Sequence, residues 1–158
     1  MATLPLWAGL SAGSTVLVDT APLIYWLEGH AVFAERFAGM FQAAASGDLH
    51  IALSTITLAE VLTGPYQAGQ TALARRYENA LQQCRVVDIT PAIAILGAQL
   101  RAQYRLKLPD ALQLACTLDI GADALVTHDR DFSRLGGVLI VTGADLGPPP
   151  ARGAKPFD

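Results

Sequence analysis

Five short apolar segments, each separated from the next by sequence with helical periodicity, restrict the fold of this 158-residue chain more than any other feature. The first segment, residues 15–19, reads Thr-Val-Leu-Val-Asp, with aliphatic and β-branched residues that no polar residue interrupts before the final acid. Uninterrupted runs of this kind are typical of strands buried on both faces, as in parallel sheets. The other segments are residues 49–53, 86–89, 124–127 and 138–141.

Helical patterns fill the intervals between these segments. Apolar residues three or four positions apart predict one amphipathic stripe within residues 32–45, and Gly29 and the pair Gly64-Pro65 are expected to end helices. Strands that alternate with helices predict an α/β fold with a central, mainly parallel sheet of about five strands. The predicted helices cover residues 21–28, 32–45, 55–62, 70–83, 91–104 and 109–118.

Length and composition predict one domain. With 52% hydrophobic and 16% charged residues, the chain can bury one sizeable core. We expect an N-terminal extension over residues 1–14, a globular domain over residues 15–142 and a Pro-rich tail over residues 143–158.

The expected location is the cytoplasm, without membrane association. No apolar run reaches the roughly 18 residues that span a bilayer, and the charge-free start of the chain lacks the basic residues of a secretory signal. Cys84 and Cys116 are far apart and fit no metal-binding pair, so we interpret them as reduced thiols.

The net charge gives no direct indication of a nucleic-acid partner. It is −3, from 11 Lys and Arg against 14 Asp and Glu. Basic residues nevertheless cluster locally, and the sequence leaves open whether these clusters are solvated helix faces or contacts to phosphates. The clusters are Arg75-Arg76, then Arg101, Arg105 and Lys107, then Arg130 and Arg134.

Four acidic residues stand where predicted strands end or predicted helices begin. Asp19 and Asp129 follow strand segments, whereas Glu60 and Asp110 are expected in the first turns of helices. The carboxyl ends of parallel strands meet at one edge of a sheet, so we expect all four acids to converge there. Ionised carboxylates that converge need a cation, and oxygen ligands suit Mg²⁺ or Mn²⁺. The pattern predicts metal-assisted chemistry on phosphates.

Each acid also has a purely structural explanation. Asp19 is compatible with an Asx-turn, and Glu60 with a capping box that starts at Thr57. Asp110 would stabilise a helix N-terminus through the macrodipole, and Asp129 would fit an exposed turn. One shared site accounts for all four residues at once, whereas the structural explanations must each hold separately.

The four acids, in this order and context, resemble those of PIN-domain ribonucleases, and most closely the VapC toxins of bacterial and archaeal toxin–antitoxin systems. The resemblance extends over about residues 15–141. The motifs that carry it are Val16-Leu-Val-Asp19-Thr20, Ser54-Thr-Ile-Thr-Leu-Ala-Glu60-Val61, Leu108-Pro-Asp110-Ala-Leu-Gln-Leu-Ala115 and Leu125-Val-Thr-His-Asp129-Arg-Asp-Phe132.

The resemblance implies a three-layer α/β/α fold and an endoribonuclease activity that depends on Mg²⁺ or Mn²⁺. It places Asp19, Glu60, Asp110 and Asp129 at catalytic positions. Asp19, Asp110 and Asp129 are the expected metal ligands. Glu60 would hold a metal-bound water or act as a general base, and the sequence does not separate these roles.

The resemblance further implies an RNA substrate, a small cognate antitoxin and a homodimer. Thr127 and Asp131 match supporting positions near the last acid. Two alternatives stay open. One is a receiver-like Mg²⁺-binding phosphotransfer domain, although neither Lys107 nor Lys155 stands at the strand end where that chemistry needs a lysine. The other is a non-catalytic PIN-like module that binds RNA.

Overall fold

The computed structural model describes residues 7–31, 33–128 and 138–142, and these residues form a five-stranded sheet in which every pairing is parallel. The strand order is β3-β2-β1-β4-β5, so β1 occupies the centre. The strands are β1 (Ser14–Val18), β2 (Leu49–Ser54), β3 (Arg85–Val87), β4 (Ala124–Thr127) and β5 (Ile140–Thr142).

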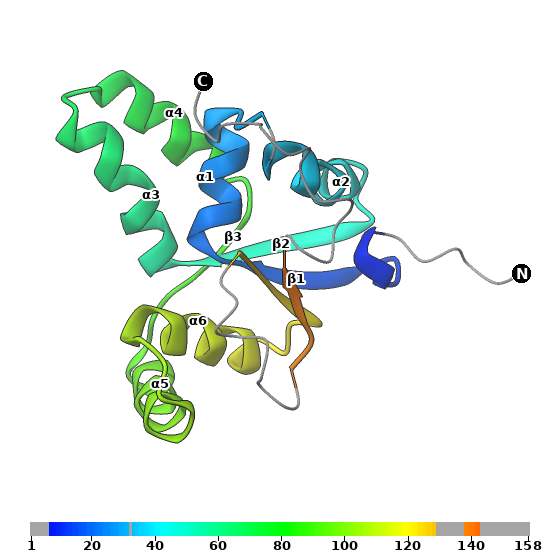
Figure 1. Cartoon of the computed structure of the whole chain (residues 1–158), viewed down its shortest axis with the longest axis vertical. Helices are drawn as coiled ribbons and strands as arrows, with labels where there is room; N and C mark the ends of the chain where they lie inside the picture. The colour runs from blue at the N-terminus through cyan, green and yellow to red at the C-terminus, as the bar shows by residue number, and fades with distance from the viewer. Residues whose placement is uncertain (1–6, 32, 129–137, 143–158) are drawn as a thin grey trace, which may run out of the picture.

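Helices cover both faces of the sheet (Figure 1). Helices α1 to α4 lie on one face and α5 and α6 on the other, which confirms the predicted three-layer α/β/α fold. Within the described ranges, no helix is long and apolar enough to cross a membrane. The helices are α1 (Thr20–Glu28), α2 (Phe33–Ala45), α3 (Thr55–Gln67), α4 (Thr71–Leu81), α5 (Pro91–Tyr104) and α6 (Leu108–Asp119), preceded by the short 3-10 turn η1 (Trp7–Gly9).

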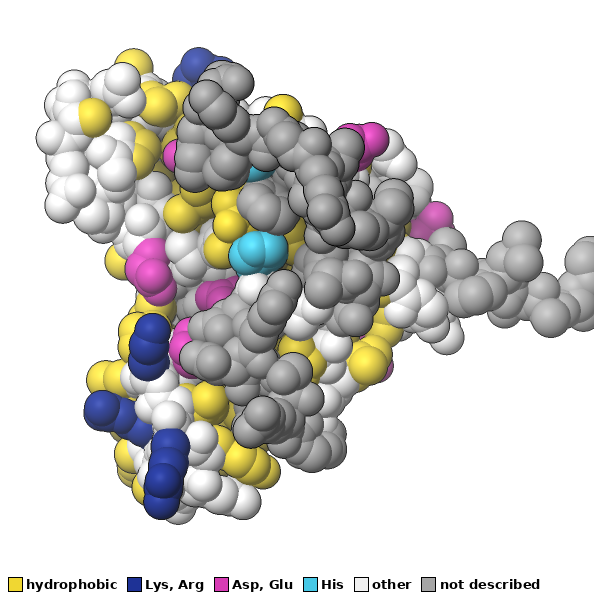
Figure 2. Space-filling model, viewed as in Figure 1, with side chains coloured by type: hydrophobic (Ala, Val, Ile, Leu, Met, Phe, Trp, Pro, Cys, Tyr) yellow, Lys and Arg dark blue, Asp and Glu magenta, His cyan; other side chains and the backbone are white. Residues whose placement is uncertain are grey.

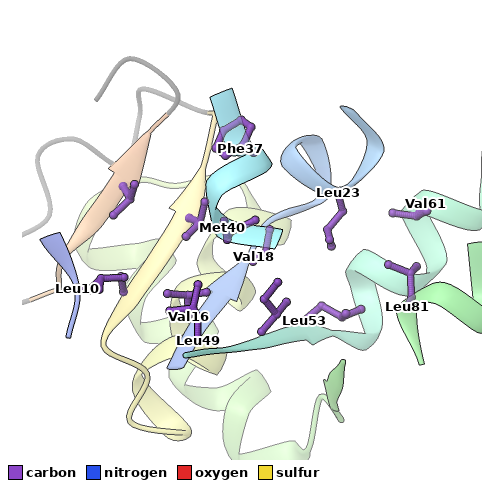
Figure 3. Close-up of a cluster of buried hydrophobic side chains, with 14 residues drawn as sticks. Leu10, Val16, Val18, Leu23, Phe37, Met40, Leu49, Leu53, Val61 and Leu81 are labelled. Atoms are coloured by element: carbon purple, nitrogen blue, oxygen red, sulfur yellow. The ribbon is translucent and has the colours of Figure 1, made fainter. Parts of the chain in front are cut away.

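The central strand supplies side chains to two hydrophobic cores. Val16 and Val18 point into the core beneath α1 to α4, which Figure 3 shows, whereas Leu17 points into the core beneath α5 and α6. All three side chains are fully buried, and burial of such an aliphatic side chain stabilises a fold by about 1.5–3 kcal/mol. This two-sided burial explains why the three residues directly before Asp19 are all aliphatic.

The parallel arrangement brings the ends of β1 and β4 together. The backbone N–H of Asp19 donates to the carbonyl of Val126 at 2.8 Å, so the pairing of β1 with β4 continues to the first residue beyond β1. Asp19 is then the N-cap of α1. The chain therefore turns from strand to helix at the carboxyl edge of the sheet, directly beside the end of β4.

Some expected boundaries are wrong. Gly64-Pro65 does not end α3, which continues to Gln67 with Pro65 buried inside it. Gly64 has no Cβ to clash with the proline ring, and burial of that ring compensates for the missing hydrogen bond. The alternative explanation of Glu60 as part of a capping box with Thr57 is excluded, since Ser54 is the N-cap of α3 and accepts from the Thr57 N–H at 3.3 Å.

The two outer strands are shifted from their predicted positions: β3 begins and ends earlier, and β5 begins and ends later. Each is only three residues long and has one neighbouring strand, so pairing rather than local pattern sets its limits. The expected tail over residues 143–158 and the first six residues of the expected N-terminal extension lie outside the described residues.

Candidate active site

A hollow of about 350 Å³ at the carboxyl edge of the sheet brings together three of the four predicted acids. Asp19, Glu60 and Asp110 all line it. Figure 2 shows acidic side chains gathered on this face between α3 and α6. Asp129 and Asp131 lie outside the described residues, so their predicted place beside this hollow remains a prediction. The other lining residues are Thr20, Ala21, Ile24, Pro109 and His128.

Three different elements supply the acids. Asp19 directly follows β1, and Asp110 lies in the first turn of α6, as expected. Glu60 lies in the second turn of α3, which begins at Thr55, and not in the first turn as predicted. The end of β1 therefore brings Asp19 to the hollow, while α3 and α6 bring Glu60 and Asp110 to it.

The Asp19 carboxylate accepts hydrogen bonds at both of its oxygens. Its Oδ1 accepts from the Thr20 N–H at 2.8 Å and from Gln113 Nε2 at 3.2 Å. Its Oδ2 accepts from Thr127 Oγ1 at 2.9 Å, so Thr127 lies where a supporting residue was expected. Donors that reach both oxygens fix the plane of the carboxylate, whereas an exposed aspartate samples several rotamers.

Gln113 is the residue of this site that the sequence analysis missed. Its side chain is 1% exposed, and it bonds to Ser54, Thr57 and Asp19. The available signal was a single amide inside the run Ala111-Leu-Gln-Leu-Ala115, on a helix that is otherwise apolar there. A buried amide needs partners, so a lone glutamine in such a run indicates a polar network.

Partial burial raises the pKa of the Glu60 carboxyl, and the negative charge of Asp19 raises this pKa further. A hydrogen bond from Thr20 Oγ1, 3.3 Å from Glu60 Oε1, opposes the shift. The Glu60 side chain remains solvent-exposed, so water screens much of the repulsion. The direction nevertheless shows that two carboxylates repel each other across this hollow, and a bound cation would relieve that repulsion.

We expect Glu60→Gln to make the metal-free protein more resistant to heat at neutral pH. Because the pKa of Glu60 is higher in the folded state, its protonation stabilises the fold. This stabilisation is fully present below about pH 4.3, where unfolded glutamate titrates, and it is lost as the pH rises through the folded-state pKa. Glutamine cannot ionise, so the gain in Tm over wild type should grow from about pH 4 to about pH 7. Thermal melts in EDTA measure this difference.

Glu35→Gln, which changes an exposed glutamate in the first turn of α2, is the matched control. That change removes a favourable interaction with the helix dipole, so it should lower Tm slightly. A pH-independent difference between Glu60→Gln and wild type would contradict the proposed repulsion.

The donor set of the hollow fits a hard divalent cation. Within the described parts of the chain, no group of three His, Cys, Asp or Glu side chains forms a complete metal cage. Mg²⁺ does not need one, because it is commonly held by one or two carboxylates, several waters and a substrate phosphate. Asp19 and Asp110 offer carboxylate oxygens to one hollow that contains no cysteine. Its single imidazole, from His128, does not disfavour Mg²⁺ or Mn²⁺ at a carboxylate site.

A larger hollow, of about 790 Å³, lies at the opposite edge, where β1, β2 and β3 begin. Its walls include Trp26 and Phe41, whose rings stack at a centroid distance of 4.1 Å, together with His50 and Arg85. None of the described residues that line it is acidic. Size therefore does not identify the reactive site here, and the smaller acidic hollow is the candidate.

Comparison with known proteins agrees with this geometry. A family model described as the PIN domain matches residues 16–138. The chain belongs to the PIN-domain family. The matched range includes all four predicted acids. Membership excludes the receiver-like alternative and confirms the expected class, a nuclease domain of the kind found in toxin–antitoxin systems.

Solved structures share the fold of this PIN domain. A chain from a toxin–antitoxin complex of Klebsiella pneumoniae is 31% identical, with a TM-score of 0.65 over 81% of this chain and 97% of that one. DNA-bound VapBC from Salmonella typhimurium is 21% identical, with a TM-score of 0.65 over 82% and 98% of the two chains.

A third similar structure is VapC20 from Mycobacterium tuberculosis, described as a toxin that cleaves the sarcin-ricin loop. It is 20% identical to this PIN domain, with a TM-score of 0.61 over 77% of this chain and 95% of that one. These last two likenesses confirm at the level of fold the expected similarity to VapC toxins. Among curated proteins, none matches the chain.

Proposed function

We propose that this PIN domain is a metal-dependent endoribonuclease, and that it acts in the cytoplasm as the toxin of a toxin–antitoxin pair. The observation that carries the proposal is the placement of Asp19, Glu60 and Asp110 around one hollow by three separate elements. Burial and then the negative charge of Asp19 raise the pKa of Glu60, and a bound cation would offset the repulsion between the two carboxylates.

Asp19 and Asp110 would hold Mg²⁺ or Mn²⁺, and Asp129 is the proposed third ligand. When bound, the cation would lower the pKa of a coordinated water and offset charge on the phosphate that is attacked. Glu60 lies across the hollow from Asp19, within reach of Thr20 Oγ1. Its raised pKa suits a residue that accepts a proton from the attacking water, since a general base works best when its pKa lies near the working pH.

Basic side chains beside the acids would bind the phosphates that flank the cleaved bond. Arg101, Arg105 and Lys107 are all exposed, and they lie at the end of α5 and the start of α6. Figure 2 shows basic side chains gathered there, directly beside the acidic group. Cations in this place would let a polyanion approach an acidic hollow despite the net charge of −3.

The toxin role rests on similarity. The Klebsiella pneumoniae relative, at 31% identity, is part of a toxin–antitoxin complex. A cognate antitoxin that inserts a basic side chain, such as arginine, among Asp19, Glu60 and Asp110 would displace the cation and block the hollow by charge. A homodimer is the proposed oligomeric state.

The decisive experiment incubates the purified full chain with structured RNAs in Mg²⁺, in Mn²⁺ and in EDTA, and separates the products on denaturing gels. We expect internal cleavage with either metal and none in EDTA. Cleavage that persists in EDTA would overturn the metal mechanism. RNA binding without cleavage in any metal would instead favour a non-catalytic RNA-binding module.

A further inference from the structure

We infer that Gln113, a buried glutamine outside the predicted acid set, is the positioning residue that orients Asp19 and connects it to Glu60. The inference rests on the proposed function, because it gives Gln113 a role in building the cation site. Gln113 lies on α6, one turn beyond Asp110, so this helix would supply both an acid and the residue that holds another acid. The side chain is 1% exposed and touches three other elements.

The bonds of the amide fix which way it points. Gln113 Oε1 accepts from Ser54 Oγ at 2.8 Å, while Nε2 donates both to Thr57 Oγ1 and to Asp19 Oδ1. The flipped amide would set Oε1 against the Asp19 carboxylate and leave the Ser54 hydroxyl facing an N–H donor. Only the observed orientation satisfies all three partners, so Gln113 presents a fixed donor to Asp19.

A chain of hydroxyl groups continues from this amide to Glu60. Thr20 Oγ1 lies 3.3 Å from Thr57 Oγ1 and 3.3 Å from Glu60 Oε1. A hydroxyl has one proton, and the Glu60 carboxylate can only accept. All contacts are satisfied when Gln113 donates to Thr57, Thr57 to Thr20, and Thr20 to Glu60. The Glu60 carboxylate therefore fixes the direction of this chain, and the Gln113 amide supplies the N–H at its start while its second N–H holds Asp19.

A glutamine with only a structural role would need fewer hydrogen-bond partners. Thr117, one turn further along α6, is equally buried at 1% exposure, yet its hydroxyl needs only the Gln113 backbone carbonyl, at 2.8 Å. Gln113 instead spans from the N-cap of α3 to the end of β1. If this position only filled the core, an apolar side chain of similar size would serve without the need for buried hydrogen bonds.

The test compares Gln113→Met with Thr117→Val in the full chain. Methionine keeps the length and flexibility of glutamine but offers no N–H donor. We expect Gln113→Met to weaken Mn²⁺ binding, measured by isothermal titration calorimetry, by about 10- to 100-fold, the usual effect of losing a partner of a metal ligand. The Mn²⁺ concentration for half-maximal cleavage should rise by the same factor, while RNA affinity in EDTA stays unchanged.

Thr117→Val should lower Tm without changing either Mn²⁺ measurement. Gln113→Leu is the second variant should Gln113→Met fail to fold, and the same result is expected of it. Wild-type Mn²⁺ affinity in both Gln113 variants would overturn the inference, as would an equal loss in Thr117→Val. A wild-type chain that neither binds Mn²⁺ nor cleaves RNA would overturn the proposed function itself, a separate outcome.

Discussion

Asp19→Asn should reduce Mn²⁺-dependent RNA cleavage by at least about 100-fold. Loss of a residue that only orients a metal ligand costs up to about 100-fold, and loss of a ligand itself should cost at least as much. The fold should survive, because asparagine can keep the observed contacts. Its Oδ1 can still accept from the Thr20 N–H and from Gln113, and its Nδ2 can donate to Thr127 Oγ1, whose hydroxyl rotates to accept. Initial cleavage rates and thermal melts, taken on the same preparation, separate the two effects.

Asp123→Asn is the matched control for this change. Asp123 also accepts a backbone N–H, from Thr15 at 2.8 Å, but it lies at the opposite edge of the sheet. We expect that variant to keep wild-type cleavage rates and to lose a little stability. Full activity in Asp19→Asn would rule out Asp19 as a ligand and leave only its role as the N-cap of α1.

Much of the fold could be predicted because local patterns and tertiary burial agree. The aliphatic residues Val16, Leu17 and Val18 directly precede Asp19, as two-sided burial in a parallel sheet requires, and β1 is the central strand. The helix of residues 91–104 was predicted with its observed limits, since Thr90 caps it through the Ile93 N–H and Pro91 begins it. Where caps were clear, boundaries were predictable.

The errors arose where tertiary contacts override local signals. Pro65 was expected to end α3, yet its burial lets the helix continue. Gln113 was missed for a related reason. A sequence shows that an amide lies among apolar residues, but not that Ser54, Thr57 and Asp19 surround it from other elements. An acid among apolar residues stands out in a sequence because a charge is costly to bury. The neutral side chains that hydrogen-bond to it do not stand out in the same way.

Asp110→Asn should also reduce cleavage by about 100-fold, and it discriminates between the two explanations of this acid. If Asp110 served only the dipole of α6, its removal would cost about 0.3–1 kcal/mol of stability and leave cleavage intact. If it holds the cation, cleavage falls far more than stability does. Asp119→Asn, at the other end of the same helix, is the control and should remain active.

The double variant Asp19→Asn with Asp110→Asn tests whether the two carboxylates act on one cation. Ligands of one ion act as a unit, so losing the second should cost little after the first is gone. We therefore expect the double variant to cleave RNA nearly as slowly as the slower single variant. Residues that act independently contribute additively to the activation free energy, so their rate losses multiply. A double variant whose loss equals the product of the two single losses would therefore contradict a shared cation.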